Sequence, residues 1–152
     1  MLDTWNSAEA LVRIAAALES GRLPPVGDRA FLACAIRRWL QEDEPIDRAL
    51  GLGGGQGLRK ARTTYLRECR NAALRKAHTL VDGPSAWQRS VALAAEVRHF
   101  NASIWPCWGG LDEPPTGFSD LRAALFEAAN LGALPETPEG LHRICGPFAH
   151  DL

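Results

Sequence analysis

Residues 51–80 read GLGGGQGLRKARTTYLRECRNAALRKAHTL, and this stretch decides the fold class. A glycine-rich loop over residues 51–57 precedes a run without glycine or proline, which predicts a helix over residues 58–80. Apolar residues recur along the run at helical spacing, so the helix is expected to be amphipathic. The apolar face is expected to carry Leu58, Ala61, Tyr65, Leu66, Cys69, Ala72, Ala73 and Leu80.

The glycines do not form a nucleotide-binding motif. A P-loop requires GxxxxGK[ST], and no lysine follows a glycine here in that register. In the dinucleotide pattern GxGxxG, Gly51 and Gly53 match the first two positions, but the third falls on Gln56 and no strand precedes the motif. No nucleotide cofactor is therefore expected.

The rest of the chain shows the same helical periodicity, and no segment alternates with the period of two that strands require. Residues 103–118, SIWPCWGGLDEPPTGF, hold three prolines and predict a loop. Trp39 and Trp87 are expected in the core. We therefore expect a single all-α domain over residues 1–152, a compact bundle of five to seven helices. Helix N-caps are expected at Ser7, Asp28, Ser85, Ser119 and Thr137.

Composition excludes several classes of protein. The net charge of −1 and the 46% hydrophobic content are those of an ordinary globular domain. No apolar run reaches the roughly 18 residues that a membrane span needs, and the start of the chain lacks the pattern of a secretory signal. The four cysteines form no CxxC pair. We expect a cytoplasmic protein that has no membrane partner.

Charge is segregated along the chain. Residues 28–80 hold 11 basic and 6 acidic side chains, whereas residues 81–152 hold 4 basic and 9 acidic ones. A basic outer face on the helix 58–80 predicts binding of nucleic acid, DNA rather than RNA, in an accessory or regulatory role. The connection over 51–57 exceeds the turn of a helix-turn-helix, which leaves a looser three-helix module over 28–80. The candidate phosphate contacts are Arg59, Lys60, Arg62, Arg67, Arg70, Arg75 and Lys76, extended by Arg37 and Arg38.

Two other interpretations of the basic face stay open. In one, it is an ordinary solvated surface, or it pairs with carboxylates of the acidic half. In the other, the chain is a protein-binding adaptor or inhibitor that meets an acidic surface and anchors through Trp105 and Trp108. The same two tryptophans are also suited to plugging the helical core as a lid.

Catalytic and metal sites are not favoured by the sequence. Glu96 and His99, like Glu139 and His142, have the Glu-x-x-His spacing of di-metal helical bundles, with Glu68 and Glu127 as further carboxylates. Gly140 and the position of the second pair in the first turn of a short helix argue against a rigid site. His142 and Cys145 alone have a zinc-like spacing, to be completed by Cys107 or His99. No motif marks a nucleophile, so we expect no catalytic residue, metal or cofactor, and favour a protein that is not an enzyme.

Three runs of the sequence carry a resemblance: RECRNAALRKA, SAWQRSVALAAEVRHF and LRAALFEAANLGALPETPEGLHRIC. Together they resemble small helical proteins encoded by phages and mobile elements of proteobacteria, over about residues 58–145. The resemblance implies a phage or mobile-element accessory protein. It includes no diagnostic motif and assigns no site residue.

Overall fold

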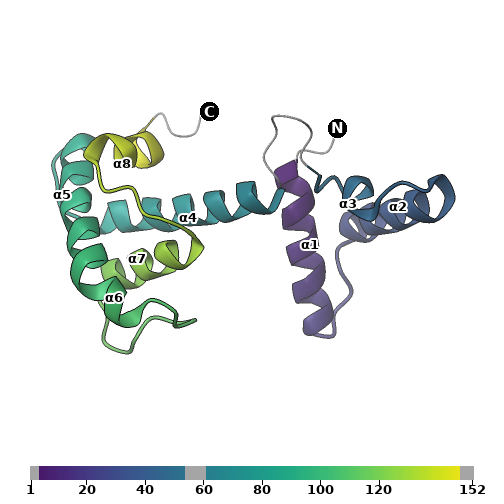
Figure 1. The fold of residues 1–152 in the computed structure, drawn as a ribbon, viewed down its shortest axis with the longest axis horizontal. Helices are drawn as coiled ribbons and strands as arrows, with labels where there is room; N and C mark the ends of the chain where they lie inside the picture. Colours follow the sequence, from purple (N-terminus) through teal and green to yellow (C-terminus); the bar gives the residue numbers. More distant parts are fainter. Residues whose placement is uncertain (1–3, 54–60, 148–152) are drawn as a thin grey trace. The chain divides into compact units, whose positions relative to one another are not determined.

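The computed structural model of the chain describes residues 4–53 and 61–147. No β-strand occurs among these residues, where an isolated bridge pairs Gly109 with Leu111. The predicted all-α class is confirmed, and the described helices of eight residues or more number six, within the predicted range. The elements are α1 (Thr4–Glu19), α2 (Val26–Glu42), α3 (Ile46–Ala49), α4 (Ala61–Leu80), α5 (Ala86–His99), the π-helical η1 (Phe100–Ile104), α6 (Trp105–Trp108), α7 (Asp120–Leu131) and α8 (Pro138–Cys145) (Figure 1).

The chain forms two compact units, Met1–Tyr65 and Leu66–Leu152, with the boundary inside α4. The single domain expected from the sequence stays a prediction. Of the glycine-rich loop 51–57, the first three residues are described and are not helical. The last four lie outside the described residues.

In the first unit, α1, α2 and α3 pack around a core of small and medium side chains: Ala10, Ile14, Ala35 and Ala49. A bidentate ion pair joins the first two helices. The guanidinium of Arg13 donates from Nε and Nη2 to the two carboxylate oxygens of Asp28, at 2.9 and 2.8 Å.

That ion pair explains why one predicted helix start is wrong. We expected Asp28 to cap α2, but the helix begins two residues earlier, after Pro25. Pro25 is the N-cap residue, with φ of −50° and ψ of 148°, and Val26 is the first helical residue. The Asp28 side chain is thereby left inside the first turn, where it bonds Arg13 instead of backbone N–H groups. Ser7 also lies inside its helix, since α1 begins at Thr4.

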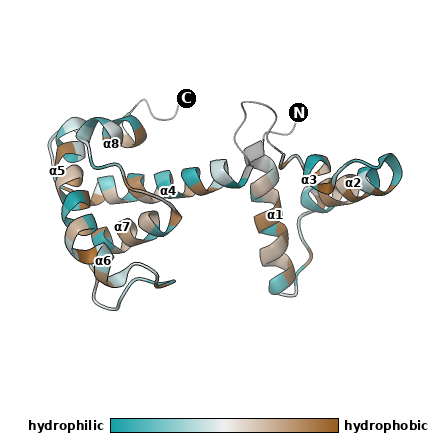
Figure 2. Cartoon of the chain, viewed as in Figure 1, coloured by the Kyte–Doolittle hydropathy of each residue, from teal (hydrophilic) through white to brown (hydrophobic). Residues whose placement is uncertain are grey.

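Four helices of the second unit, α4, α5, α7 and α8, surround one hydrophobic core (Figure 2). Its largest side chains are fully buried: Leu74, Leu93, Phe100, Leu125, Phe126 and Leu141. Three predicted N-caps of this unit are confirmed. Ser85, Ser119 and Thr137 each accept a hydrogen bond from the backbone N–H three residues later.

The predicted loop over residues 103–118 is wrong for its first six residues, which are helical. The chain continues from α5 through η1 into α6, and the Trp105 N–H bonds the carbonyl of Phe100, five residues back. Pro106 follows directly. Proline has no N–H and clashes with the carbonyl four residues before it, and a π-helical turn relieves that conflict by shifting the hydrogen-bond register. The irregular segment begins at Gly109.

Candidate functional site

Helix α4 carries five described members of the predicted phosphate-binding set. Arg59 and Lys60 lie outside the described residues. Arg62 and Lys76 are exposed, and within residues 4–53 and 61–147 neither side chain has an ion pair or hydrogen bond. These two cations therefore agree with the expected outward orientation.

Arg70 is instead part of the packing of the second unit. Its Nη1 atom donates to the carbonyl oxygen of Ala133 at 3.0 Å, and Nη2 donates to the side chain of Asn71 at 3.1 Å. Burial lowers the pKa of the Arg70 guanidinium, and the positive charge of Arg67 lowers it further. The guanidinium thus ties α4 to the segment that follows α7.

Arg67 and Arg75 share one carboxylate on the same helix. Glu68 lies 3.5 Å from Nε of Arg67 and 3.8 Å from Nη2 of Arg75. The Nε atom of Arg75 also donates to the carbonyl of Ile144 at 3.2 Å, which connects α4 to the end of α8. Both side chains are only about one third exposed. Part of the positive charge of α4 is therefore paired with a carboxylate of the same helix.

The predicted division of α4 into apolar and basic faces is wrong by part of a turn. The buried side carries Ala73, Leu74 and Ala77, whereas Leu80 of the predicted apolar face is 42% exposed. Arg70, one turn before Leu74, lies along the buried side. The physical reason is that alanines give a weak periodic signal, and packing against the neighbouring helices selects the buried side.

The two arginines nominated on α2 differ in their surroundings. Arg38 pairs with Glu44 through both carboxylate oxygens, at 2.9 and 2.6 Å. Arg37 is exposed, and no partner of its side chain occurs among the residues that the structure describes.

A row of exposed apolar side chains lies along α2 and was not expected. Ile36 is 39% exposed, Trp39 49% and Leu40 68%. We call these three residues the α2 apolar row. Their i, i+3, i+4 spacing places them on one side of the helix. Trp39 was expected in the core, and so was Trp87, which is 44% exposed; both expectations are wrong.

A signal for the α2 apolar row is present in the sequence. Large apolar residues occupy positions 31, 32, 36, 39 and 40 of this helix, an arc wider than one packing neighbour can cover. Of the apolar residues at these positions and their neighbours on α2, the described part of the first unit buries Ala35 and half-buries Phe31 and Leu32. The remainder of the arc faces outward.

The tryptophans of the second unit fit the lid interpretation better than the anchor. The ring of Trp105 packs against Phe100 and Phe126, with centroids 6.0 and 5.7 Å apart. Trp108 is 43% exposed and meets the edge of Phe118. Trp105 is therefore a partly buried residue packed against the core, and Trp108 is the more exposed of the pair.

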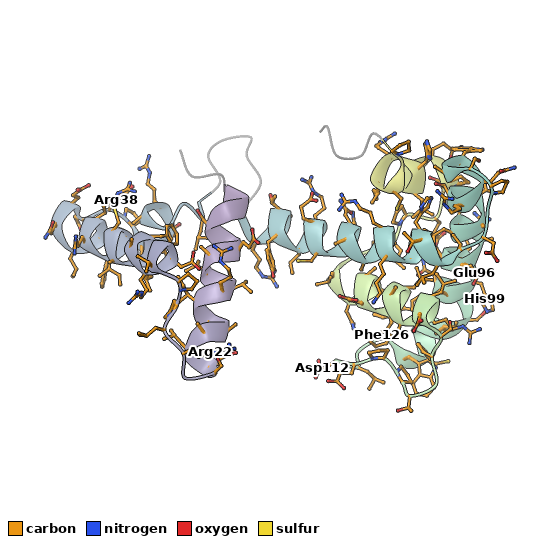
Figure 3. All side chains as sticks on the ribbon, turned by 180° about the vertical axis from the view of Figure 1, so that it is seen from behind. Arg22, Arg38, Glu96, His99, Asp112 and Phe126 are labelled. Carbon is orange, nitrogen blue, oxygen red and sulfur yellow. The ribbon has the colours of Figure 1, made fainter. Side chains whose placement is uncertain are left out.

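The Glu-x-x-His pairs do not converge on one site. Glu96 and His99 are exposed on α5 (Figure 3). His142, of the second pair, packs edge-on against Trp87, with ring centroids 5.4 Å apart. Among the described residues, no group of three or more histidine, cysteine or acidic side chains is arranged to hold a metal ion.

Comparisons of the chain with protein-family models, with curated proteins and with solved structures gave no match. Within the described residues, every helix is too short or too polar to cross a membrane.

Proposed function

We propose that the chain is a protein-binding adaptor or inhibitor that inserts one side of α2 into an apolar groove of its partner. The observation that carries the proposal is the α2 apolar row. A single exposed apolar residue is ordinary, but a contiguous row is typical of an interaction site. The spacing of Ile36, Trp39 and Leu40 is that of the anchors with which an amphipathic helix binds a groove.

The charges that border the row indicate the chemistry of the partner. Arg29 lies seven residues before Ile36, about two helical turns, and therefore on the same side of α2. Arg29 and Arg37 are exposed. Asp28 and Arg38 instead form ion pairs within the chain, with Arg13 and Glu44 respectively. Asp43 lies seven residues after Ile36 and is exposed at the C-terminal end of α2, so the free charge beside the row is positive near Arg29 and negative near Asp43. The complementary groove is apolar at its centre, with acidic groups at the edge that meets Arg29.

A photo-crosslinking amino acid in place of Leu40 tests this proposal. The crosslinked protein is identified by mass spectrometry, purified and titrated with the unmodified chain. We expect Trp39→Ala to weaken binding at least tenfold, since a tryptophan anchor dominates such contacts. Trp87→Ala is the matched control, because Trp87 is exposed to a similar extent on another helix. Arg29→Glu with Arg37→Glu should slow association and reduce its dependence on salt.

Two outcomes contradict the proposal. Crosslinking of position 40 only to a second copy of the chain assigns the row to self-association. Equal loss of binding in the Trp39 and Trp87 variants places the interface elsewhere.

Nucleic-acid binding is the second candidate. It is favoured by Arg62 and Lys76, which are exposed and have no side-chain partner among residues 4–53 and 61–147. Fluorescence polarisation with short duplex DNA and single strands over a sodium chloride gradient tests it. If these residues contact phosphates, Arg62→Glu with Lys76→Glu lowers affinity and reduces the slope of log K against log salt by about 0.9 per lost contact on duplex DNA. Arg122→Glu, an exposed arginine of α7, is the control. Affinity unchanged by the double substitution argues against this candidate.

The cytoplasm is the compartment that fits either candidate. All four cysteines are free thiols, as is usual where disulfides are kept reduced. An origin in a phage or mobile element stays a prediction from the sequence.

A further inference from the structure

The first unit contains a cavity of about 360 Å³ at the junction of α1, α2 and α3. This volume lies within the range of small-ligand sites. Its lining combines a hydroxyl, an aromatic ring, two guanidinium groups and one carboxylate. The residues are Ser7, Phe31, Arg38, Glu44, Arg48, Ala49, Leu50 and Gly51.

Ser7 is the most unusual member of this lining. The residue is 1% exposed, yet its hydroxyl has no hydrogen-bond partner in the described part of the chain. Buried hydroxyl groups are nearly always bonded, and inside a helix they commonly use the carbonyl four residues earlier. An unpaired hydroxyl on a cavity wall is therefore available to a ligand.

Gly51 keeps the space beside this hydroxyl open. Its φ of +67° suits glycine, and a Cβ atom at this position would lie 3.0 Å from the Ser7 oxygen. Any larger residue would have to displace the serine side chain. Glycine thus serves both the turn after α3 and the close approach of that turn to the Ser7 side chain.

The charges of the cavity favour an anion. Arg38 is neutralised by its close pair with Glu44. Arg48 lines the same cavity, and no ion pair or hydrogen bond of its side chain is found among residues 4–53 and 61–147. The side chains lining the cavity carry a net charge of +1, which is located on Arg48. Phe31 provides an apolar wall against which a flat ring can pack.

We propose that this cavity binds a small organic anion, in which a carboxylate or phosphate group contacts Arg48 and accepts a hydrogen bond from Ser7, while an apolar ring lies against Phe31. A guanidinium can contact either oxyanion through two N–H groups. The site is separate from the α2 apolar row, so its test does not depend on the proposed function.

The test is to titrate the full chain with three probes, benzoate, phenyl phosphate and neutral benzamide. Binding is monitored through the amide chemical shifts in NMR spectra. We expect saturable shifts at Ala49, Leu50 and Gly51 with at least one anion. Benzamide should bind at least tenfold more weakly. The anion that binds with the higher affinity shows whether the site prefers a carboxylate or a phosphate group.

Variants assign the binding groups. Arg48→Gln should weaken binding of the anion at least tenfold, and Ser7→Ala severalfold, whereas Arg122→Gln on α7, outside the cavity, leaves affinity unchanged. Ser7→Ala should also keep or raise the Tm of the ligand-free protein, because it removes an unpaired buried hydroxyl. The absence of saturable shifts with both anions, or shifts insensitive to Arg48→Gln, overturns the proposal. So does a Ser7→Ala protein of lower Tm that binds the anion normally.

Discussion

The Nε2 atom of His78 lies 3.2 Å from the hydroxyl oxygen of Ser90, at a buried junction of α4 and α5. The same nitrogen lies 3.1 Å from the carbonyl oxygen of Ala86, to which the Ser90 hydroxyl donates at 3.0 Å. Nδ1 of His142, on α8, is 3.5 Å from that hydroxyl. Ser90 is completely buried, and its hydroxyl is already bonded within the cluster. The cluster therefore joins three helices and has the character of a structural network.

Protonation of His78 should destabilise the second unit. Burial is the main reason that the pKa of His78 is lowered from its ordinary value of 6.5. The unfolded chain then binds the proton more tightly than the folded chain, so stability present above pH 6.5 is lost as the pH falls through and below that value. Denaturant unfolding at pH 7.5 and 5.5 measures the loss. We expect His78→Gln to flatten this dependence and His99→Gln, an exposed control, to leave it unchanged. If the free energy of unfolding of the His78 variant falls between pH 7.5 and 5.5 as much as that of the unaltered protein, His78 is not the group responsible.

Removal of a core side chain from α5 should be costly. Leu93 is fully buried, whereas Val91, on the same helix, is 44% exposed. We expect Leu93→Ala to lower the free energy of unfolding by roughly 2–5 kcal/mol, because it removes apolar contacts and leaves a cavity. Val91→Ala should change it by about 0.5 kcal/mol or less. Urea titration followed by circular dichroism measures both; similar values for the two variants contradict the described core.

The thiol of Cys145 should react slowly. Burial raises its pKa to about 11, although the positive charge of Arg75 acts in the opposite direction. The thiolate is the reactive form, so at neutral pH little of it is present. We expect iodoacetamide to modify the exposed Cys34 and Cys107 well before Cys145. Timed labelling with peptide mass spectrometry gives the order, and early modification of Cys145 contradicts it.

Local capping chemistry was predictable from the sequence where it acts alone. Ser85, Ser119 and Thr137 each begin a helix, because a hydroxyl three residues before a backbone N–H satisfies that donor without help from the rest of the fold. Asp28 and Ser7 failed as caps because distant groups decide their roles. Arg13, fifteen residues away, takes the Asp28 carboxylate, and Ser7 faces a cavity formed by three helices.

The candidate sites were less predictable, because burial on a helix depends on its neighbours. Periodicity identified α4 as amphipathic but assigned Arg70 to the outer face, whereas its guanidinium bonds the carbonyl of Ala133, sixty-three residues away. For Trp39 the error is the reverse, because a residue expected to be buried is exposed. Its size suggested the core, yet the first unit offers it no full enclosure. Neither result follows from local spacing, since both depend on long-range contacts.

Two cations of α4 should have different roles when tested in the same protein. The Nη1 atom of Arg70 bonds the Ala133 carbonyl, whereas Lys76 is exposed without a partner in the described part of the chain. Arg70→Gln should lower the free energy of unfolding by about 1 kcal/mol, the typical net value of such a hydrogen bond at a partly exposed site. Lys76→Gln should leave stability nearly unchanged. Thermal and urea unfolding of the two variants measure the difference. An Arg70 variant as stable as the Lys76 variant shows that the guanidinium adds nothing to the fold, which returns Arg70 to the set of cations available to an external anion.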